Sequence, residues 1–257
     1  PLVRRGYLEP ELTYDTNVKG TLNVLSASTY AESVRAQLIV TTDKVYRNDG
    51  NFRPYRESDP LGGSDPYSAS KAAADVIAQE RLLQPNAVPG GVARAGNVIG
   101  AGDVSADRLI PDLIRSIMAN KPMRVRNRSA VRPWQHVLDC LHGYLLLLQG
   151  VERDGLRGPW NFGPSSDKSK TVHDVLVMAR KVVDFSVSGR DEAVPPIREH
   201  AYLALDSTHA RSMLGWHDHL DLATSVEWSL IEAHARSSEA FEEAIWKQID
   251  FFNDRAL

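Results

Sequence analysis

The chain has 257 residues, of which 42% are hydrophobic, and its 30 basic and 33 acidic residues give a net charge of −3. This balance gives no electrostatic reason to bind nucleic acid or an anionic membrane, and the length suffices for a sizeable core in one or two domains. The single cysteine, Cys140, excludes an internal disulfide, and no apolar run is long enough to span a bilayer, so we expect a cytoplasmic protein.

The first predicted elements are a helix and a strand. Residues 11–31 show an amphipathic helical pattern, and residues 36–42 (AQLIVTT) form the short apolar run that is typical of a buried strand. Thr41 and Thr42 stand where this strand ends. Because ligands of open α/β sheets bind at the carboxyl ends of the strands, these positions are candidates for a site. A polar loop is predicted at 47–65.

A tyrosine and a lysine begin the next predicted helix, at 67–84. The helix follows Asp65 and Pro66, which suit a helix start. Tyr67 and Lys71 are four residues apart, so their side chains share one face. An ammonium group beside a phenol favours the phenolate, and the pair therefore predicts a tyrosine of lowered pKa that removes a proton from a sugar hydroxyl. A tyrosine packed along a lysine stem would give the same spacing.

The later elements alternate between helices and short strands. They are a strand at 90–96, a helix at 107–120 that begins at Asp107, a helix at 137–149, a strand at 160–162 and a helical stretch at 222–254. Thr171 and Asp174 fit a capping box, and Gly215 fits a helix end. This alternation predicts an α/β fold with a parallel sheet and a smaller C-terminal lobe.

Seven short motifs extend over most of the chain, namely TDKVY (42–46), PYRESDPLGGSDP (54–66), YSASK (67–71), RAGNVIGAGD (94–103), DRLIP (107–111), AVRPWQHV (130–137) and WNFGP (160–164). With these motifs the sequence resembles the CDP-glucose 4,6-dehydratases, a branch of the extended short-chain dehydrogenase/reductase superfamily. The YxxxK pattern is generic to that superfamily. TDK together with RPWQH and DRLIP is specific to this branch.

The resemblance implies a Rossmann-type parallel sheet with a smaller α/β C-terminal substrate lobe. It assigns 1–98 and 137–163 to a partial NAD-binding domain, and 99–136 and 164–257 to a nucleotide-sugar-binding lobe. Such enzymes open with a strand and a glycine-rich turn that holds the pyrophosphate of NAD, and no such turn stands here. We therefore expect the N-terminal strands to be missing from this chain, with about 90 residues preceding Pro1.

The resemblance also implies a reaction, the NAD-dependent dehydration of CDP-D-glucose to CDP-4-keto-6-deoxy-D-glucose. Tyr67, with Lys71, would remove the C4 hydroxyl proton while the C4 hydride passes to NAD, and Thr42 would orient that oxygen. Asp43 would protonate the departing C6 hydroxyl. Lys44 stands where related dTDP-sugar dehydratases carry glutamate, so it is either a neutral base or an electrostatic aid.

Further positions are assigned to binding through the same resemblance. Asn17 and Arg94 join Tyr67 and Lys71 on the cofactor side. Guanidinium groups match phosphate oxygens, so an arginine such as Arg132 suits a diphosphate, although a solvated strand face is the alternative for this arginine-rich segment. The predicted substrate-binding residues are Asn97, Arg108, Leu109, Ile110, Pro111, Arg126, Arg132 and Gln135. His217 and His219 lack a nearby third ligand, and no metal is expected.

Alternatives remain open on this evidence. Another nucleotide-sugar 4,6-dehydratase, or a 4-epimerase, would share the fold, but an epimerase needs no acid for a C6 hydroxyl. A non-catalytic truncated remnant would bind a nucleotide sugar or a partner without binding NAD. The resemblance also suggests a homodimer or tetramer that packs the helices at 11–31 and 67–84 against their twins.

Overall fold

A parallel three-stranded sheet forms the centre of the larger lobe of this computed structural model, which describes residues 3–165, 168–189, 200–233, 235 and 237–256. The strands β1 (Gln37–Val40), β2 (Gly90–Ala95) and β6 (Gly158–Phe162) lie in the order β1-β2-β6. Ile39 pairs with Val92, and Ala93 pairs with Trp160. β2 is buried along its whole length because it is the central strand and helices cover both of its faces.

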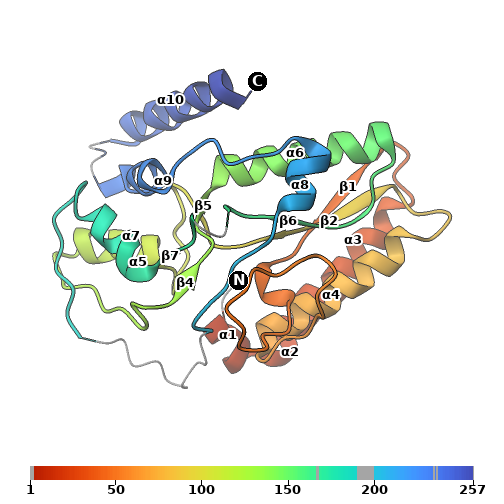
Figure 1. The fold of residues 1–257 in the computed structure, drawn as a ribbon, viewed down its shortest axis with the longest axis horizontal. Coiled ribbons are helices and arrows are strands. Elements are labelled where there is room, and N and C mark those ends of the chain that lie inside the picture. The colour runs from red at the N-terminus through yellow and green to blue at the C-terminus, as the bar shows by residue number, and fades with distance from the viewer. Residues whose placement is uncertain (1–2, 166–167, 190–199, 234, 236, 257) are drawn as a thin grey trace.

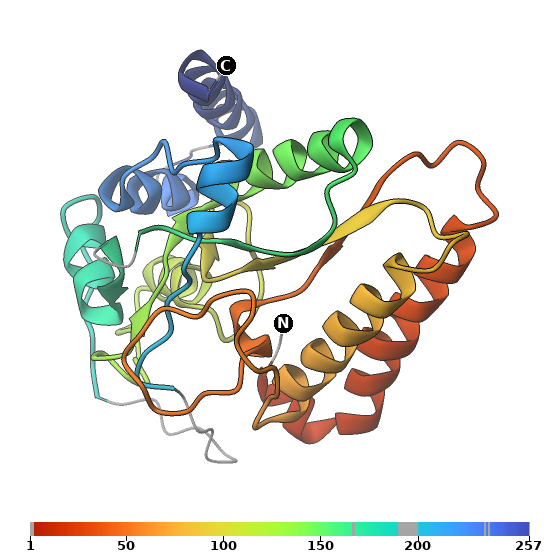
Figure 2. The same cartoon turned by 45° about the vertical axis from the view of Figure 1, so that its right-hand side comes forward.

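Helices pack on the two faces of this sheet (Figures 1 and 2). On one face lie α3 (Gly20–Ser28) and α4 (Pro66–Leu82), which bury Leu25 and Ala78 against Val92. On the other face α6 (Val137–Asp154) and α8 (Thr208–Leu214) bury a cluster that includes Leu147 and Trp216 against Trp160. Neighbouring residues of β2 therefore serve opposite cores, as the alternation of side chains along a strand requires.

The predicted helix at 11–31 is present as a divided helical segment. After α1 (Val3–Leu8) come α2 (Pro10–Tyr14), a π-helical turn η1 (Asp15–Lys19) and then α3. The predicted strand at 36–42 is confirmed as β1, with both threonines beyond its end. The predicted helix at 67–84 is confirmed as α4.

The start of α4 is fixed by its first residues. Asp65 accepts hydrogen bonds from the amide of Ser68 at 2.9 Å and from its hydroxyl at 2.6 Å, and Pro66 occupies the first turn. An N-cap carboxylate satisfies amide groups that have no partner within the helix, so the helix begins at one defined residue. This placement determines which residues of α4 face the end of β1.

The smaller lobe contains two short strand pairs and several helices. β3 (Val98–Ile99) pairs with β5 (Gln135–His136), and β4 (Val131–Arg132) pairs with β7 (Lys170–Thr171). The helices are α5 (Leu109–Met118), α7 (Val172–Ala179), α9 (Leu222–Ser229), the 3-10 turn η4 (Ile231–Ala233) and α10 (Ser238–Ala256). Their core includes Leu113, Val175 and Val226, all fully buried. The domain boundaries stay a prediction, and α8 packs against β6 of the larger lobe.

One predicted helix start in this lobe is wrong, and one predicted helical stretch is present with interruptions. Asp107 does not begin α5, because its backbone takes a positive φ of 63° that a helix excludes, and the helix starts at Leu109. The stretch predicted as helical at 222–254 is divided into α9, η4 and α10. The capping box of Thr171 and Asp174 is confirmed at α7, and the helix end at Gly215 is confirmed at α8, where Gly215 has a φ of 66°.

The loop that contains Tyr55 pairs with the segment that contains Leu205. The amide of Tyr55 donates to the carbonyl of Ala204 at 2.9 Å, and the amide of Asp206 donates to the carbonyl of Tyr55 at 2.8 Å. Tyr55 and Leu205 thereby form a parallel bridge.

Within the described residues, no helix combines the length and the apolar content that crossing a membrane requires.

Candidate active site

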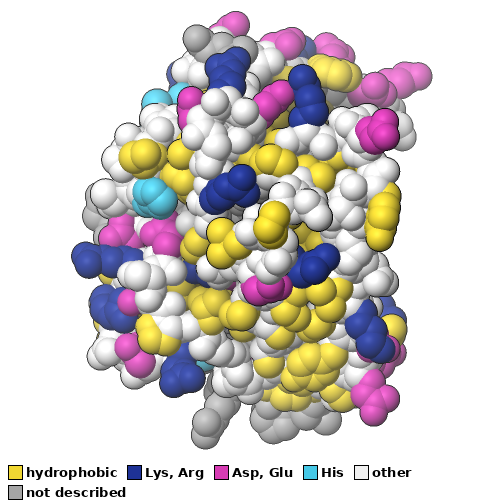
Figure 3. Space-filling view, turned by 90° about the vertical axis from the view of Figure 1, so that its right-hand side faces the viewer, with side chains coloured by type: hydrophobic (Ala, Val, Ile, Leu, Met, Phe, Trp, Pro, Cys, Tyr) yellow, Lys and Arg dark blue, Asp and Glu magenta, His cyan; other side chains and the backbone are white. Residues whose placement is uncertain are grey.

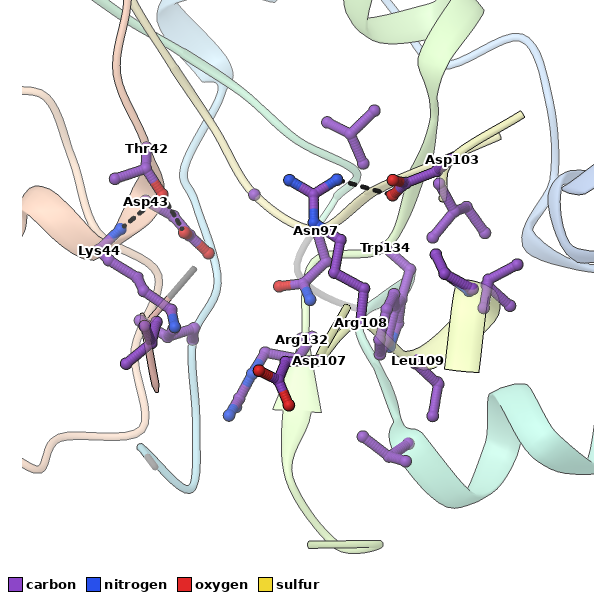
Figure 4. Close-up of a pocket in the computed structure, with 18 of the residues that line it drawn as sticks. Thr42, Asp43, Lys44, Asn97, Asp103, Asp107, Arg108, Leu109, Arg132 and Trp134 are labelled. Atoms are coloured by element: carbon purple, nitrogen blue, oxygen red, sulfur yellow. Dashed lines mark hydrogen bonds and ion pairs between the residues drawn. The ribbon is translucent and has the colours of Figure 1, made fainter. Parts of the chain in front are cut away.

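A cavity of about 360 Å³ lies between the two lobes, at the carboxyl ends of β1 and β2 (Figure 4). Most of the predicted site residues line it, namely Thr42, Asp43, Lys44, Tyr67, Asn97, Arg108, Leu109, Ile110, Pro111, Arg126 and Arg132. They come from the end of β1, the start of α4, the segment after β2, the start of α5, the segment between α5 and β4, and β4 itself. The size falls within the range of pockets that hold small organic ligands.

The residues after β1 form a short turn that presents side chains to the cavity. Thr42 caps the 3-10 turn η2 (Asp43–Val45), and its hydroxyl accepts the amide of Lys44 at 3.4 Å. The same hydroxyl donates to Oδ1 of Asp43 at 3.0 Å. We call residues 42–45 the catalytic turn. Its hydrogen bonds fix the threonine and the aspartate relative to each other (Figure 4).

Asp43 is held in a state that favours protonation. Its side chain is only 3% exposed, and its Oδ2 has no hydrogen-bond partner. Burial raises the pKa of Asp43, against opposing effects of the Lys44 charge, the Thr42 hydroxyl and the Arg132 charge. A raised pKa favours the protonated carboxyl, which is the form that a general acid needs.

Tyr67 lies against the catalytic turn, but its pKa differs from the prediction. Burial raises the pKa of Tyr67 to about 12, although a hydrogen bond with Thr42 lowers it, and the Asp43 charge raises it further. The expectation that Lys71 gives this phenol a lowered pKa is therefore corrected. Lys71 shares the helix face, but its long side chain reaches the end of β1, where Nζ donates to the carbonyl of Val40 at 2.8 Å.

The opposite wall of the cavity carries arginines and apolar side chains. Arg132 is 7% exposed, and one of its guanidinium nitrogens donates to the carbonyl of Val131 at 2.8 Å. Arg108 is paired with Asp103 at 2.7 Å, and Arg126 donates to the carbonyl of Asp107 at 3.0 Å. Together with the apolar start of α5, this wall suits a ligand with both anionic and flat apolar parts.

Arg94 and Gln135 do not line the cavity, and their predicted binding roles stay predictions. Arg94 is 1% exposed, and its guanidinium pairs with Asp75 at 2.6 Å in the interior. Gln135 is 4% exposed, and its amide donates to the carbonyl of Phe162 at 2.8 Å. Both residues stand in motifs that border the site, and a motif does not tell which face of a short strand a side chain takes.

Asn17 also lies away from the cavity lining. It stands in the π-helical turn η1, and its amide donates to the hydroxyl of Ser70 at 2.9 Å. Ser70 is the residue before Lys71 on α4. The contact of Asn17 is therefore with the helix that carries Tyr67 and Lys71, and its role toward a cofactor stays a prediction.

Several lining residues were not predicted as site residues, namely Arg4, Asp103, Asp107, Trp134, His200 and Leu203. Arg4 of α1 forms an ion pair with Asp107 at 2.9 Å. Trp134 stands within the RPWQH motif, two residues after Arg132, so its position in the sequence indicated that it could line the cavity. His200 and Leu203 belong to a segment without a motif. Within the described ranges, no group of three or more metal-ligating side chains is arranged to hold a metal ion.

Known proteins that are similar to this chain agree on one family. A family model described as "NAD dependent epimerase/dehydratase family" matches residues 2–163. The CDP-glucose 4,6-dehydratase of Salmonella typhimurium is 38% identical over 236 residues, which cover 88% of this chain and 66% of that relative. The dTDP-glucose 4,6-dehydratase of Streptomyces griseus is 28% identical over 239 residues, covering 92% of this chain and 70% of that relative. The chain thus spans about two thirds of the length of these curated relatives.

A solved structure supports the fold. The structure of MoeE5 in complex with UDP-glucose and NAD aligns with a TM-score of 0.79 and 22% sequence identity, covering 90% of this chain and 75% of that chain. The predicted α/β fold with a Rossmann-type parallel sheet is confirmed by this alignment and by the observed strand order. On the family model and the relatives together, the chain belongs to the NAD dependent epimerase/dehydratase family.

Proposed function

We propose that this chain carries the site of an NAD-dependent nucleotide-sugar 4,6-dehydratase, a hydro-lyase that converts CDP-D-glucose to CDP-4-keto-6-deoxy-D-glucose. The observation that carries the proposal is the buried carboxyl of Asp43 beside Thr42 and Tyr67 on one cavity. An acid at this place is what dehydration needs and C4 epimerisation does not. The 38% identity to a CDP-glucose 4,6-dehydratase supports the cytidine nucleotide.

The residues present fit the part of NAD that would lie at the carboxyl ends of β1 and β2. Val40, Thr41, Ala95 and Gly96 line the cavity there, and open α/β sheets bind dinucleotides at this edge. The donors available beside it are the Tyr67 hydroxyl and the ammonium of Lys71, which suit the hydroxyl groups of a ribose. The chemistry that bound NAD would supply is a hydride acceptor for C4, whose reduced form is the hydride donor for C6.

Tyr67 and Thr42 would act on the C4 hydroxyl. A hydrogen bond joins Tyr67 to Thr42, so one substrate oxygen can lie against both hydroxyl groups. Tyr67 takes the C4 hydroxyl proton in its ionised form. Since the pKa of Tyr67 is about 12, only a small fraction is ionised at neutral pH, and oxidation should become faster as the pH rises.

Asp43 and Lys44 would act on the elimination that follows. Once C4 is a ketone, the C5 proton is acidic and would pass to a base, for which Lys44 in its neutral form is the candidate, while Asp43 would give its proton to the C6 hydroxyl, which leaves as water. A charged Lys44 lowers the pKa of Asp43. The two readings of Lys44, as a neutral base and as an electrostatic aid, therefore differ in the effect that its removal should have on this acid. Arg132 and Arg126 would hold the diphosphate, and Leu109 with its neighbours would support the pyrimidine.

The test is a substrate comparison on the full-length protein. CDP-glucose, dTDP-glucose, UDP-glucose and GDP-glucose are each supplied with NAD, and the keto sugar is followed by its absorbance in alkali. Product from CDP-glucose at the highest kcat/KM is the expected result. Preferred turnover of another nucleotide sugar contradicts the substrate, and epimerised product without loss of water contradicts the reaction class. Absence of NAD binding to the 257-residue chain would favour a remnant for this form.

The same proposal includes a homodimer. Large hydrophobic side chains are exposed over the helices of one side of the molecule, among them Leu12, Val24 of α3 and Val76 of α4. Figure 3 shows hydrophobic side chains gathered on the side where α3 and α4 lie. Such a patch on a protein surface is typical of an interface, and a second copy could cover it by helix packing. Sedimentation of Val76→Asp against the parent protein tests this: the variant should be monomeric.

A further inference from the structure

An ion pair lies in the interior directly behind the catalytic turn. Arg94 of β2 and Asp75 of α4 have side chains that are 1% and 0% exposed. Their contact is bidentate, with Nε to Oδ2 at 2.8 Å and a terminal nitrogen to Oδ1 at 2.6 Å. Desolvation makes a buried ion pair a weak source of stability, so its other contacts are informative.

One end of the catalytic turn is bound to the carboxylate of this pair. The hydroxyl of Thr41, the residue before the turn, donates to Oδ2 of Asp75 at 2.8 Å. Oδ1 also accepts a hydrogen bond from the side-chain amide Nε2 of Gln79 at 2.7 Å. Asp75 therefore has both of its oxygens occupied, and the backbone at the end of β1 is held to the middle of α4.

The other end of the turn is bound to the guanidinium of the same pair. Arg94 donates to the hydroxyl of Tyr46, the residue after the turn, at 2.9 Å, and to the carbonyl of Glu57 at 3.1 Å. The Tyr46 hydroxyl in turn donates to Oδ1 of Asn161 on β6 at 2.6 Å. Tyr46 is 2% exposed, and its ring stacks on Tyr55 with centroids 5.0 Å apart. The residue after the turn is thus fixed in direction as well as position.

Asp75 is also placed on the helix that carries the rest of the site. It stands four residues after Lys71 and eight after Tyr67, so all three lie on one face of α4. The charge of Asp75 raises the pKa of Lys71, against the larger lowering effect of burial. The ion pair therefore contacts the residues that flank the turn with the acid, and it belongs through Asp75 to the helix that carries the tyrosine.

We infer that Asp75 and Arg94 are positioning residues for the dehydratase site, which hold Thr41 and Tyr46 so that the catalytic turn keeps its place against Tyr67. This inference rests on the proposed function and adds residues that touch neither substrate nor cofactor. A small displacement of reacting groups lowers the rate of the chemical step more than it lowers binding. Loss of either hydroxyl anchor should therefore reduce kcat and leave KM near its original value.

The experiment uses hydroxyl deletions, since Asp75→Asn leaves a buried guanidinium without its charge partner and can prevent folding. Thr41→Val and Tyr46→Phe each remove one anchor and keep the shape of the side chain. In the full-length protein each should lower kcat about tenfold, as expected for one lost hydrogen bond, with KM within about twofold. Thr41→Ser, which keeps the hydroxyl, should restore kcat.

A second measurement needs no substrate. Amide hydrogen exchange at residues 42–45 should become about tenfold faster in Thr41→Val and in Tyr46→Phe, because local opening of the turn becomes easier. The matched control is Ser229→Ala, which removes a buried hydroxyl that donates to the carbonyl of Ser225 at 2.6 Å within α9. The control should change neither the exchange of the turn nor kcat.

The outcomes separate this inference from the proposed function. Unchanged exchange at 42–45 in both variants overturns the positioning role, and so does a rise in KM that accounts for the whole loss of kcat/KM. An effect of the same size in Ser229→Ala also overturns it. A parent protein that does not turn over CDP-glucose defeats the proposed function alone, because the exchange measurement still decides what holds the turn.

Discussion

The Thr42 hydroxyl donates to Oδ1 of Asp43 at 3.0 Å and leaves Oδ2 buried without a hydrogen-bond partner. Because Oδ1 already accepts a hydrogen bond, the proton of the neutral acid belongs on Oδ2. A carboxyl arranged in this way has one defined proton to give. Thr42 therefore orients the carboxyl of its own neighbour, and in the proposed mechanism it would also orient the oxygen of a substrate hydroxyl.

Asp43→Asn tests the acid directly. The amide keeps the shape of the side chain but cannot give a proton, so dehydration should fall by about 10² to 10⁴ while C4 oxidation persists. Reduced nicotinamide should then accumulate, and its absorbance after mixing with CDP-glucose measures this. The control is Asp49→Asn in an exposed loop, where Asp49 accepts the amide of Asn51 at 3.0 Å. Equal loss of oxidation and elimination in Asp43→Asn would contradict the assignment.

The two half-reactions should respond to pH in opposite directions. Oxidation needs ionised Tyr67, whose pKa is raised to about 12, so it should become faster with rising pH. Elimination needs protonated Asp43, whose pKa burial raises, so it should become slower as the pH rises through that value. Lys44→Met removes a charge that lowers the pKa of Asp43, and the elimination limb should move to higher pH. Rapid mixing over a pH series measures both steps. An unmoved limb in Lys44→Met refutes the electrostatic reading of Lys44.

Arg132→Met should weaken nucleotide-sugar binding. Arg132 is buried in the cavity wall, where solvent screens its charge poorly. Loss of its contact with a diphosphate should therefore raise the Kd for the nucleotide sugar by about 10². Titration calorimetry with CDP-glucose measures the change. Arg128→Met is the matched control, since Arg128 is exposed and does not line the cavity, and its Kd should stay unchanged. Similar losses in both variants would point to general charge attraction.

Two glycine substitutions test the packing of the helices, one at a crowded position and one at an open position. A Cβ on Gly143 of α6 would lie 2.5 Å from Phe162 and 2.8 Å from Trp216, so Gly143→Ala should reduce the free energy of unfolding by about 1 to 3 kcal/mol. Gly20 begins α3 with a helical φ of −57°, and a Cβ added there would meet no atom within 4 Å. Gly20→Ala should raise the free energy of unfolding by about 1 kcal/mol. Urea unfolding measures both, and a neutral Gly143→Ala contradicts the packing described.

Local signals in the sequence were sufficient for the elements that hold the site. The apolar run before Thr41 predicted β1, and Asp65 with Pro66 predicted the start of α4, because strand periodicity and helix capping act within a few residues. The start of α5 was misplaced, since the left-handed backbone of Asp107 depends on its tertiary contacts with Arg4 and Arg126.

Side-chain partners across the fold were harder to predict. Arg94 was expected on the cofactor, but its charge is satisfied by Asp75, which stands 19 residues earlier on another element. The pKa of Tyr67 depends on burial, which spacing along a helix does not report. His200 and Leu203 reach the cavity from a segment whose sequence has no recognisable pattern. In each case the deciding contact joins residues that are distant along the chain.

The bridge between Tyr55 and Leu205 limits how this protein can be recombined with its relatives. Chimeras that exchange the smaller lobe between enzymes of this family are an obvious route to altered substrate preference. A single crossover between residues 61 and 200 would take the two paired stretches, around Tyr55 and around Leu205, from different parents. Functional hybrids should therefore inherit residues 47–61 and 200–206 from the same parent.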